Sequence, residues 1–204
     1  MINREEIEKT RSPRGLRQFV RYRIDKVRKV TYERHKAIRR QGIYKIFTDE
    51  IIPMSLISLK LYPNTYSVTP IIGNQGYDAI VKDDCGRIMD HLEITWPQDG
   101  KRKSEDARKI VTRGYGNTDV YSPGEDIDRL CSFILKTCQK KAEKDYLDCT
   151  LVVVIDFVPP YPRDRRLYLR KLKQVAGRIK SIPFKAKRVC LLILPFRKVY
   201  EICS

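Results

Sequence analysis

Two runs of mainly apolar residues, the first rich in β-branched Val and Ile, place the strongest limit on how this chain can fold. They cover residues 151–157 and 189–194, and continuous runs of this kind are typical of strands buried inside a sheet. Helical spacing and capping residues predict helices over residues 48–61, 123–148 and 163–180. This order of elements predicts the α/β class, with one central mixed sheet flanked by helices.

A basic helical arm is predicted over residues 1–43, and the α/β core over residues 44–204. Apolar residues recur at helical spacing over residues 14–41, and the other face of this helix is rich in Arg and Lys, with Arg21 and Arg28 among them. A charged helix face is most often a solvated surface. The excess of positive charge in the chain favours instead a face that lies along a phosphate backbone.

The charge of the chain indicates the class of its partner. Of 204 residues, 42 are Lys or Arg and 25 are Asp or Glu, so the formal net charge is +17 at pH 7. Such an excess favours a polyanionic partner, and we expect nucleic acid, DNA rather than RNA. No run reaches the roughly 18–20 apolar residues of a membrane span, so no membrane partner is expected. The sequence leaves a homodimer open.

Cysteine and histidine usage narrows the chemistry and the compartment. The six cysteines form no CxxC pair and lie largely in apolar contexts, which predicts reduced core residues. The N-terminus lacks the apolar core of a signal peptide, so a cytoplasmic location is expected. Only two histidines are present, which argues against a His-based metal site or catalytic triad.

A pair of predicted strands brings two carboxylates together. Residues 76–81 and 91–96 each predict a strand that carries one acid, and a polar stretch with Gly joins them. If the turn centres on Cys85-Gly86, Asp78 lies opposite Glu93, with Cβ atoms roughly 4.5–5.5 Å apart. Two like charges at that distance repel, and a divalent cation between them would remove the repulsion. The alternative is two unrelated acids, parted by a bulge or a longer loop.

Residues 44–158 resemble the PD-(D/E)XK nuclease superfamily, which has the restriction-endonuclease-like fold. The resemblance rests on the order of elements, on Asp78 in one strand and on Glu93-Ile94-Thr95 in the next, and it extends to a group of small bacterial and phage proteins. It implies that Asp78, Glu93 and the backbone carbonyl of Ile94 hold Mg²⁺ (or Mn²⁺). The implied activity is hydrolysis of phosphodiester bonds in DNA.

Thr95 departs from the family pattern, because it stands where the motif lysine would be. Threonine can hold a water but supplies no positive charge, so we looked for a lysine elsewhere. On a helical wheel of residues 123–148, Lys141 falls within the apolar arc, whereas Lys140 faces water. Lys141 is therefore the candidate replacement, and the alternative is a lysine stem that only covers the edge of the core. Glu50 is a further catalytic candidate, although the helix dipole explains an acid there equally well.

The remaining candidates are nucleic-acid contacts. Gln75 precedes the first acid and could touch a phosphate, or it could be an ordinary turn residue. A basic loop supplies the others: Lys101, Arg102, Lys103, Arg108, Lys109 and Arg113. Two alternatives to a nuclease stay open. One is a nuclease-fold protein without catalysis that binds DNA or RNA, and the other is an RNA-binding basic protein in which the two acids are incidental.

Overall fold

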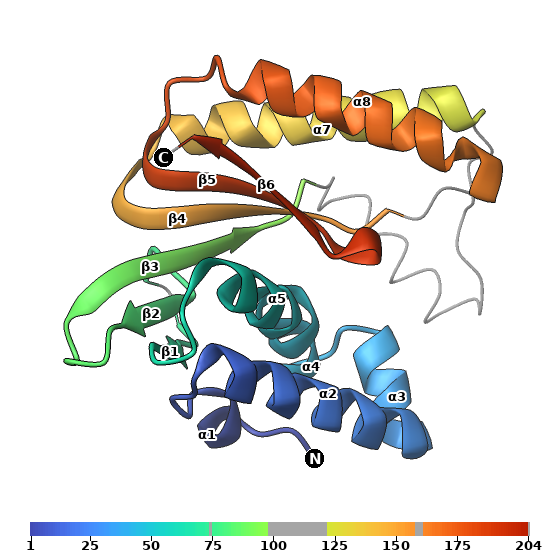
Figure 1. Cartoon of the computed structure of the whole chain (residues 1–204). Helices are drawn as coiled ribbons and strands as arrows, with labels where there is room; N and C mark the ends of the chain where they lie inside the picture. Colours follow the sequence, from blue (N-terminus) through green and yellow to red (C-terminus); the bar gives the residue numbers. More distant parts are fainter. Residues whose placement is uncertain (74, 98–121, 158–160, 204) are drawn as a thin grey trace.

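The computed structural model describes residues 1–73, 75–97, 122–157 and 161–203. A six-stranded mixed sheet lies between two layers of helices (Figure 1). The predicted α/β class and the central mixed sheet are therefore confirmed. The predicted loop contacts Lys101, Arg102, Lys103, Arg108, Lys109 and Arg113 lie outside the described residues.

The strands follow one another across the sheet in the order of the chain. They are β1 (Ser67–Pro70), β2 (Ala79–Lys82), β3 (Ile88–Thr95), β4 (Asp145–Ile155), β5 (Lys185–Ile193) and β6 (Lys198–Cys203). The first three strands pair antiparallel, β3, β4 and β5 pair parallel, and β6 returns antiparallel to β5. Strands β4 and β5 sit inside the sheet and carry the two apolar runs, as their composition predicted.

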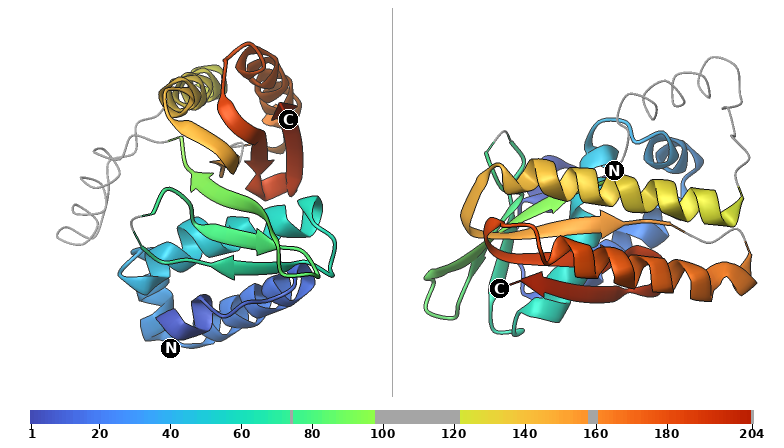
Figure 2. Two further views of the ribbon diagram at one scale, coloured as in Figure 1. Left: turned by 90° about the vertical axis from the view of Figure 1, so that its left-hand side faces the viewer. Right: turned by 90° about the horizontal axis from the view of Figure 1, so that it is seen from above.

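Two helices cover one face of the sheet. They are α7 (Pro123–Ala142) and α8 (Arg165–Ile179), which lie side by side in Figure 2. Helix α7 begins with a capping box, because the Ser122 hydroxyl accepts from the Glu125 N–H and the Glu125 carboxylate accepts from the Ser122 N–H. The helix predicted over residues 123–148 ends earlier than expected, because the chain enters β4 at Asp145 and pairs with β5 there.

The N-terminal helices cover the other face. They are α1 (Arg4–Ile7), α2 (Pro13–Lys29), α3 (Thr31–Ile38), α4 (Ile43–Ile46), a π-helical turn η1 (Phe47–Ile51) and α5 (Ile52–Leu61). Two 3₁₀ turns lie near the C-terminal strands, η2 (Pro162–Asp164) and η3 (Leu194–Phe196). Leu16 and Val20 of α2 share one buried cluster with Met54 and Ile57 of α5, so residues 1–43 pack into the same core as the sheet.

The single helix predicted over residues 14–41 is wrong. Val30 adopts an extended conformation, with φ −109° and ψ 108°, and separates α2 from α3. Val30 and Thr31 are both β-branched, which weakens a helix at this point. Val30 and Ile38 belong to the apolar set that predicted this helix, but they are 45% and 72% exposed. Among the described residues, no helix is long and apolar enough to cross a membrane.

Candidate functional site

The antiparallel β2–β3 pair sets the positions of the two acids. Ala79 pairs with Leu92 and Val81 pairs with Asp90, which is the register expected from the sequence. A bulge follows at Lys82, on the turn side of these pairs, so it does not disturb them. Asp78 lies immediately before β2, and its N–H donates to the Leu92 carbonyl at 2.6 Å.

Asp78 and Glu93 lie on the sheet face that α7 covers. Ala79, Leu92 and Ile94 are buried in the cluster beneath the N-terminal helices. Because side chains alternate along a strand, the side chains of Asp78 and Glu93 point to the opposite face. The parallel neighbour of Glu93 in β4 is Leu151, which belongs to the core under α7 and α8. The two predicted metal ligands are thus on one face, at the end of the β2–β3 pairing.

Asp78 is held by a backbone hydrogen bond. The Ile94 N–H donates to Asp78 Oδ2 at 2.6 Å, which leaves Oδ1 for another partner. Burial raises the pKa of Asp78 to about 6, and the charge of Glu93 adds to the rise, whereas the Ile94 N–H and the Lys141 charge oppose it. The nearby positive charge therefore does not fully offset the cost of burying the ionised Asp78 carboxylate.

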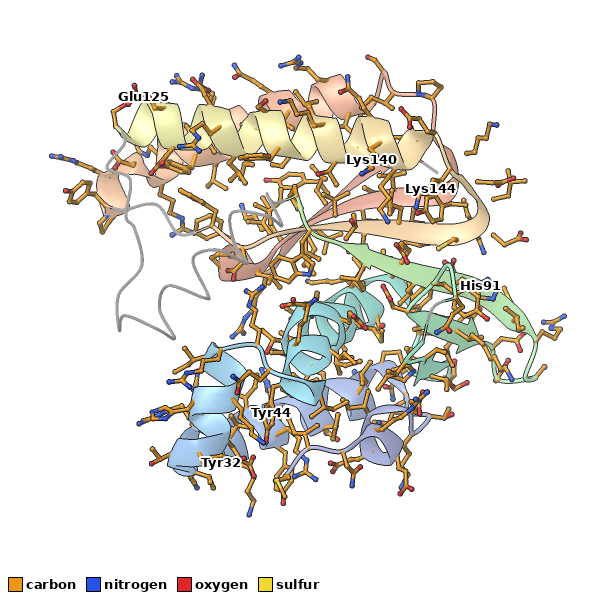
Figure 3. The ribbon with its side chains drawn as sticks, turned by 180° about the vertical axis from the view of Figure 1, so that it is seen from behind. Tyr32, Tyr44, His91, Glu125, Lys140 and Lys144 are labelled. Atoms are coloured by element: carbon orange, nitrogen blue, oxygen red, sulfur yellow. The ribbon has the colours of Figure 1, made fainter. Side chains whose placement is uncertain are left out.

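Lys141 contacts the second acid directly. Its Nζ lies 2.6 Å from Glu93 Oε1 and 3.1 Å from the Tyr146 hydroxyl. The side chains of Lys141 and Glu93 are 18% and 16% exposed. Burial lowers the pKa of Lys141, but the hydrogen bond and charge of Glu93 outweigh it, so the net effect is a raised pKa and a charged ammonium. The adjacent Lys140 is exposed and is labelled near the end of α7 in Figure 3.

Glu50 lies near Asp78 and Glu93 but belongs to the N-terminal helical layer. It lies in η1, where Pro53 has no N–H to give to the Asp49 carbonyl, and the Trp96 indole donates to that carbonyl at 2.6 Å instead. Burial raises the pKa of Glu50 to about 7, and the charges of Asp78, Asp49 and Glu93 contribute to the rise. Single π turns inside helices frequently occur at functional sites.

The other predicted residues are arranged less closely. Thr95 is half-buried on the same strand face as Glu93, two residues further along β3. Gln75 is half-buried, and its Nε2 is buried without a hydrogen-bond partner in the described part of the chain. Arg21 and Arg28 are exposed on α2, in the helical layer on the other face of the sheet.

Tyr146 is a site residue that sequence reasoning missed. It belongs to β4 but falls inside the helix predicted over residues 123–148, so its place in the sheet was not expected. A pocket of about 390 Å³ opens beside it and is also lined by Tyr77, His91 and Cys149. The Tyr77 and His91 ring centroids lie 4.4 Å apart. Burial and then the charges of nearby acids, Glu93 first, raise the pKa of Cys149 to about 12, so its thiol stays protonated.

A second group of acids has a structural role. Oxygen and sulfur atoms of Asp83, Asp84 and Cys85 lie within 4.8 Å of one another in the β2–β3 turn. Asp83 is buried and already accepts from the Cys85 and Arg87 N–H groups, and its Oδ2 is 2.7 Å from the Arg87 guanidinium. Gly86 has φ +80°, which suits glycine in a tight turn. These bonds stabilise the turn that sets the register of Asp78.

Comparison with protein-family models, with curated proteins and with solved structures finds no match to this chain. Glu50, Asp78 and Glu93 come from three segments, and the charges of Asp78 and Glu93 act on Glu50 while that of Glu93 acts on Asp78. The Lys141 ammonium lies 2.6 Å from Glu93. Such a set can bind a hard cation, place a positive charge beside it and exchange protons near neutral pH.

Proposed function

We propose that this protein is a metal-dependent nuclease that hydrolyses phosphodiester bonds in DNA. The observation that carries the proposal is the convergence of Asp78, Glu93 and Glu50 with Lys141, at 2.6 Å from Glu93, in a chain of net charge +17. We also propose the restriction-endonuclease-like fold for this chain. It is supported by the order of α5, the strands β1–β3, α7 and β4, which is that of the PD-(D/E)XK core.

The donor set suits Mg²⁺ or Mn²⁺. Asp78 Oδ1 and the Glu93 carboxylate offer the hard oxygen ligands that these ions prefer. The Ile94 N–H donates to Asp78. Because the N–H and C=O of one strand residue point to the same side of the strand, the Ile94 carbonyl points to the side of β3 on which Asp78 lies. The β2–β3 pairing ends at Ala79 and Leu92, so it does not occupy that carbonyl. The raised pKa values of Asp78 and Glu50 follow from buried negative charge that a cation would neutralise.

Each residue has a separate role in the proposed reaction. A bound divalent ion would polarise the scissile phosphate and lower the pKa of a water. The Ile94 N–H holds Asp78 in one orientation toward the ion. Lys141 supplies the positive charge that Thr95 lacks, beside the position where the phosphate gains negative charge. Glu50, with a pKa of about 7, can accept a proton at neutral pH.

The proposal is tested by cleavage of DNA. Supercoiled plasmid and single-stranded DNA are incubated with the protein in Mg²⁺ or Mn²⁺, and nicked or shortened products are measured. We expect nicking by the parent protein, none by Asp78→Asn or Glu93→Gln, and slower turnover with unchanged DNA binding for Lys141→Met. Lys140→Met removes the same charge one residue earlier and serves as the matched control. Equal nicking by the parent and Asp78→Asn would refute the proposal.

A nucleic-acid-binding protein without catalysis is the second candidate. It is favoured by Thr95 at the lysine position and by the short Lys141–Glu93 ion pair, because that pair already engages one of the two carboxylates. This candidate predicts DNA or RNA binding that does not depend on Mg²⁺ and no cleavage by any variant. The plasmid assay therefore separates the two.

A further inference from the structure

A second site lies between α2, α5 and the turn that joins β5 to β6. It is a pocket of about 160 Å³, smaller than the pocket beside Tyr146. Its apolar lining is Leu56, Leu59, Leu192 and Val199, and its charged lining is Arg17, Arg21, Lys60 and Arg197. None of the described residues that line the pocket is an acid. Four cations around a small apolar hollow indicate an anionic ligand.

The positive charges in this pocket are not neutralised by the protein. Within the described ranges, the side chains of Arg21, Lys60 and Arg197 form no hydrogen bond or ion pair, and the side chain of Arg17 donates only to the Ser55 hydroxyl, at 3.3 Å. Burial lowers the pKa of Arg17, and the charges of Arg21 and Arg197 lower it further. These guanidinium groups are therefore close enough to repel one another, and a bound anion would remove the repulsion.

The backbone at Arg197 supports a role for its side chain. Arg197 has φ 48° and ψ 36°, the left-handed conformation that glycine adopts most readily. An arginine at such a position is uncommon. Two residues after it, Val199 pairs with Leu192, and Arg197 lines the pocket together with these two apolar residues.

We propose that Arg17, Arg21, Lys60 and Arg197 bind a phosphate group at a site separate from the carboxylates. Guanidinium groups match phosphate oxygens with two parallel hydrogen bonds, and the pocket is too small for a drug-sized ligand. Lys60 lies ten residues after Glu50 in a continuous helical run, about 15 Å along the axis. The phosphate can come from a nucleic-acid backbone or from a free nucleotide, and neither source requires the nuclease proposal to hold.

The test measures binding in EDTA, so that it does not depend on cleavage. The pocket variant is the double substitution Arg21→Gln/Arg197→Gln. The control is Arg166→Gln/Arg170→Gln, which removes the same charge from exposed positions of α8. Fluorescence anisotropy follows a labelled single-stranded oligonucleotide over a range of salt, and calorimetry follows inorganic phosphate and a nucleoside monophosphate. Thermal melting shows whether both variants are folded. If the pocket variant is not folded, the single substitution Lys60→Gln replaces it.

The outcomes distinguish the two sources of phosphate. If the ligand is a backbone phosphate, the pocket variant loses about tenfold more oligonucleotide affinity than the control, with a shallower salt dependence. If the ligand is a free phosphate compound, calorimetry shows one site per chain that the pocket variant lacks, and oligonucleotide binding matches the control. Equal binding of all three probes by the pocket and control variants would overturn the proposal.

Discussion

Replacing Asp78 by Asn should stabilise the metal-free protein at alkaline pH, although it removes a proposed metal ligand. Asn keeps an oxygen to accept from the Ile94 N–H, at the position of the present 2.6 Å bond, and carries no charge to desolvate. Burial raises the pKa of Asp78 from 3.8 to about 6, so ionised Asp78 costs the folded state up to about 3 kcal/mol.

The pH dependence gives the sign of this effect. Because the pKa of Asp78 is higher in the folded than in the unfolded chain, the folded chain binds the proton more tightly. The stability that this proton confers is complete below about pH 4 and is lost as the pH rises through about 6. We therefore expect the gain from Asp78→Asn to be about 1 kcal/mol larger at pH 8 than at pH 5.

Urea unfolding in EDTA measures this difference, with the fluorescence of the single tryptophan, Trp96, as the signal. Glu93→Gln is the matched control, because it also neutralises one site carboxylate but removes the partner of Lys141. It should destabilise the protein at both pH values. If Asp78→Asn destabilises the protein at pH 8 as much as Glu93→Gln does, the inference of uncompensated negative charge at Asp78 is wrong.

Three further predictions follow from the same contacts. Lys141→Met should lower the free energy of unfolding by about 1.5–3 kcal/mol, because it leaves Glu93 unpaired. Lys140→Met should change it by less than about 0.5 kcal/mol, and equal urea midpoints for the two variants would contradict this prediction. Mg²⁺ should raise the melting temperature more at pH 8 than at pH 5, because the two carboxyls with raised pKa values must lose their protons to bind it, and an equal rise would count against a carboxylate site. Tyr62→Phe should cost about 1–2 kcal/mol in urea unfolding, because its hydroxyl donates to buried Asp90 at 2.7 Å, and an unchanged midpoint would show that this bond contributes nothing.

The hairpin shows what local sequence rules can predict. The turn was expected to centre on Cys85-Gly86, but the Gly86 N–H donates to the Asp83 carbonyl, so it centres on Asp84-Cys85 and Lys82 pairs with Ile88. The bulge between Val81 and Lys82 restores the expected register, and the alternation of apolar residues sets the strand faces. The alignment of Asp78 with Glu93 could therefore be predicted from about twenty consecutive residues. The bulge at Lys82 lies between the turn and the acids, and the pairs from Val81 to Ala79 still keep the expected register.

The elements that sequence reasoning misjudged depend on distant partners. Residues 145–148 continue the polar and apolar pattern of α7, but Asp145 and Tyr146 pair with β5, and this pairing decides their conformation. The break at Val30 is different, because the β-branched pair Val30-Thr31 is a weak local signal that the helical periodicity of residues 14–41 outweighed in the prediction. The wheel position of Lys141 was informative because the position faces the sheet, yet its partner Glu93 is 48 residues away in the chain.

The distribution of ion pairs gives the carboxylate site its significance. Elsewhere in the described chain, Glu8, Asp83 and Asp128 each have an Arg or Lys partner within 3 Å. Glu50 and Asp78 are half-buried and have no ion pair with any described residue, although Lys and Arg outnumber acids by 42 to 25. A shortage of cations does not explain this, because the fold places part of its excess on α2 and other surfaces, while the charges of Lys45 and Lys141 only partly offset the raised pKa values of Glu50 and Asp78. Negative charge without an ion pair thus remains at Glu50 and Asp78 on a positively charged protein, where it would repel a phosphate. The basic surfaces can attract DNA without help, but a phosphate can approach these carboxylates only with a cation between them.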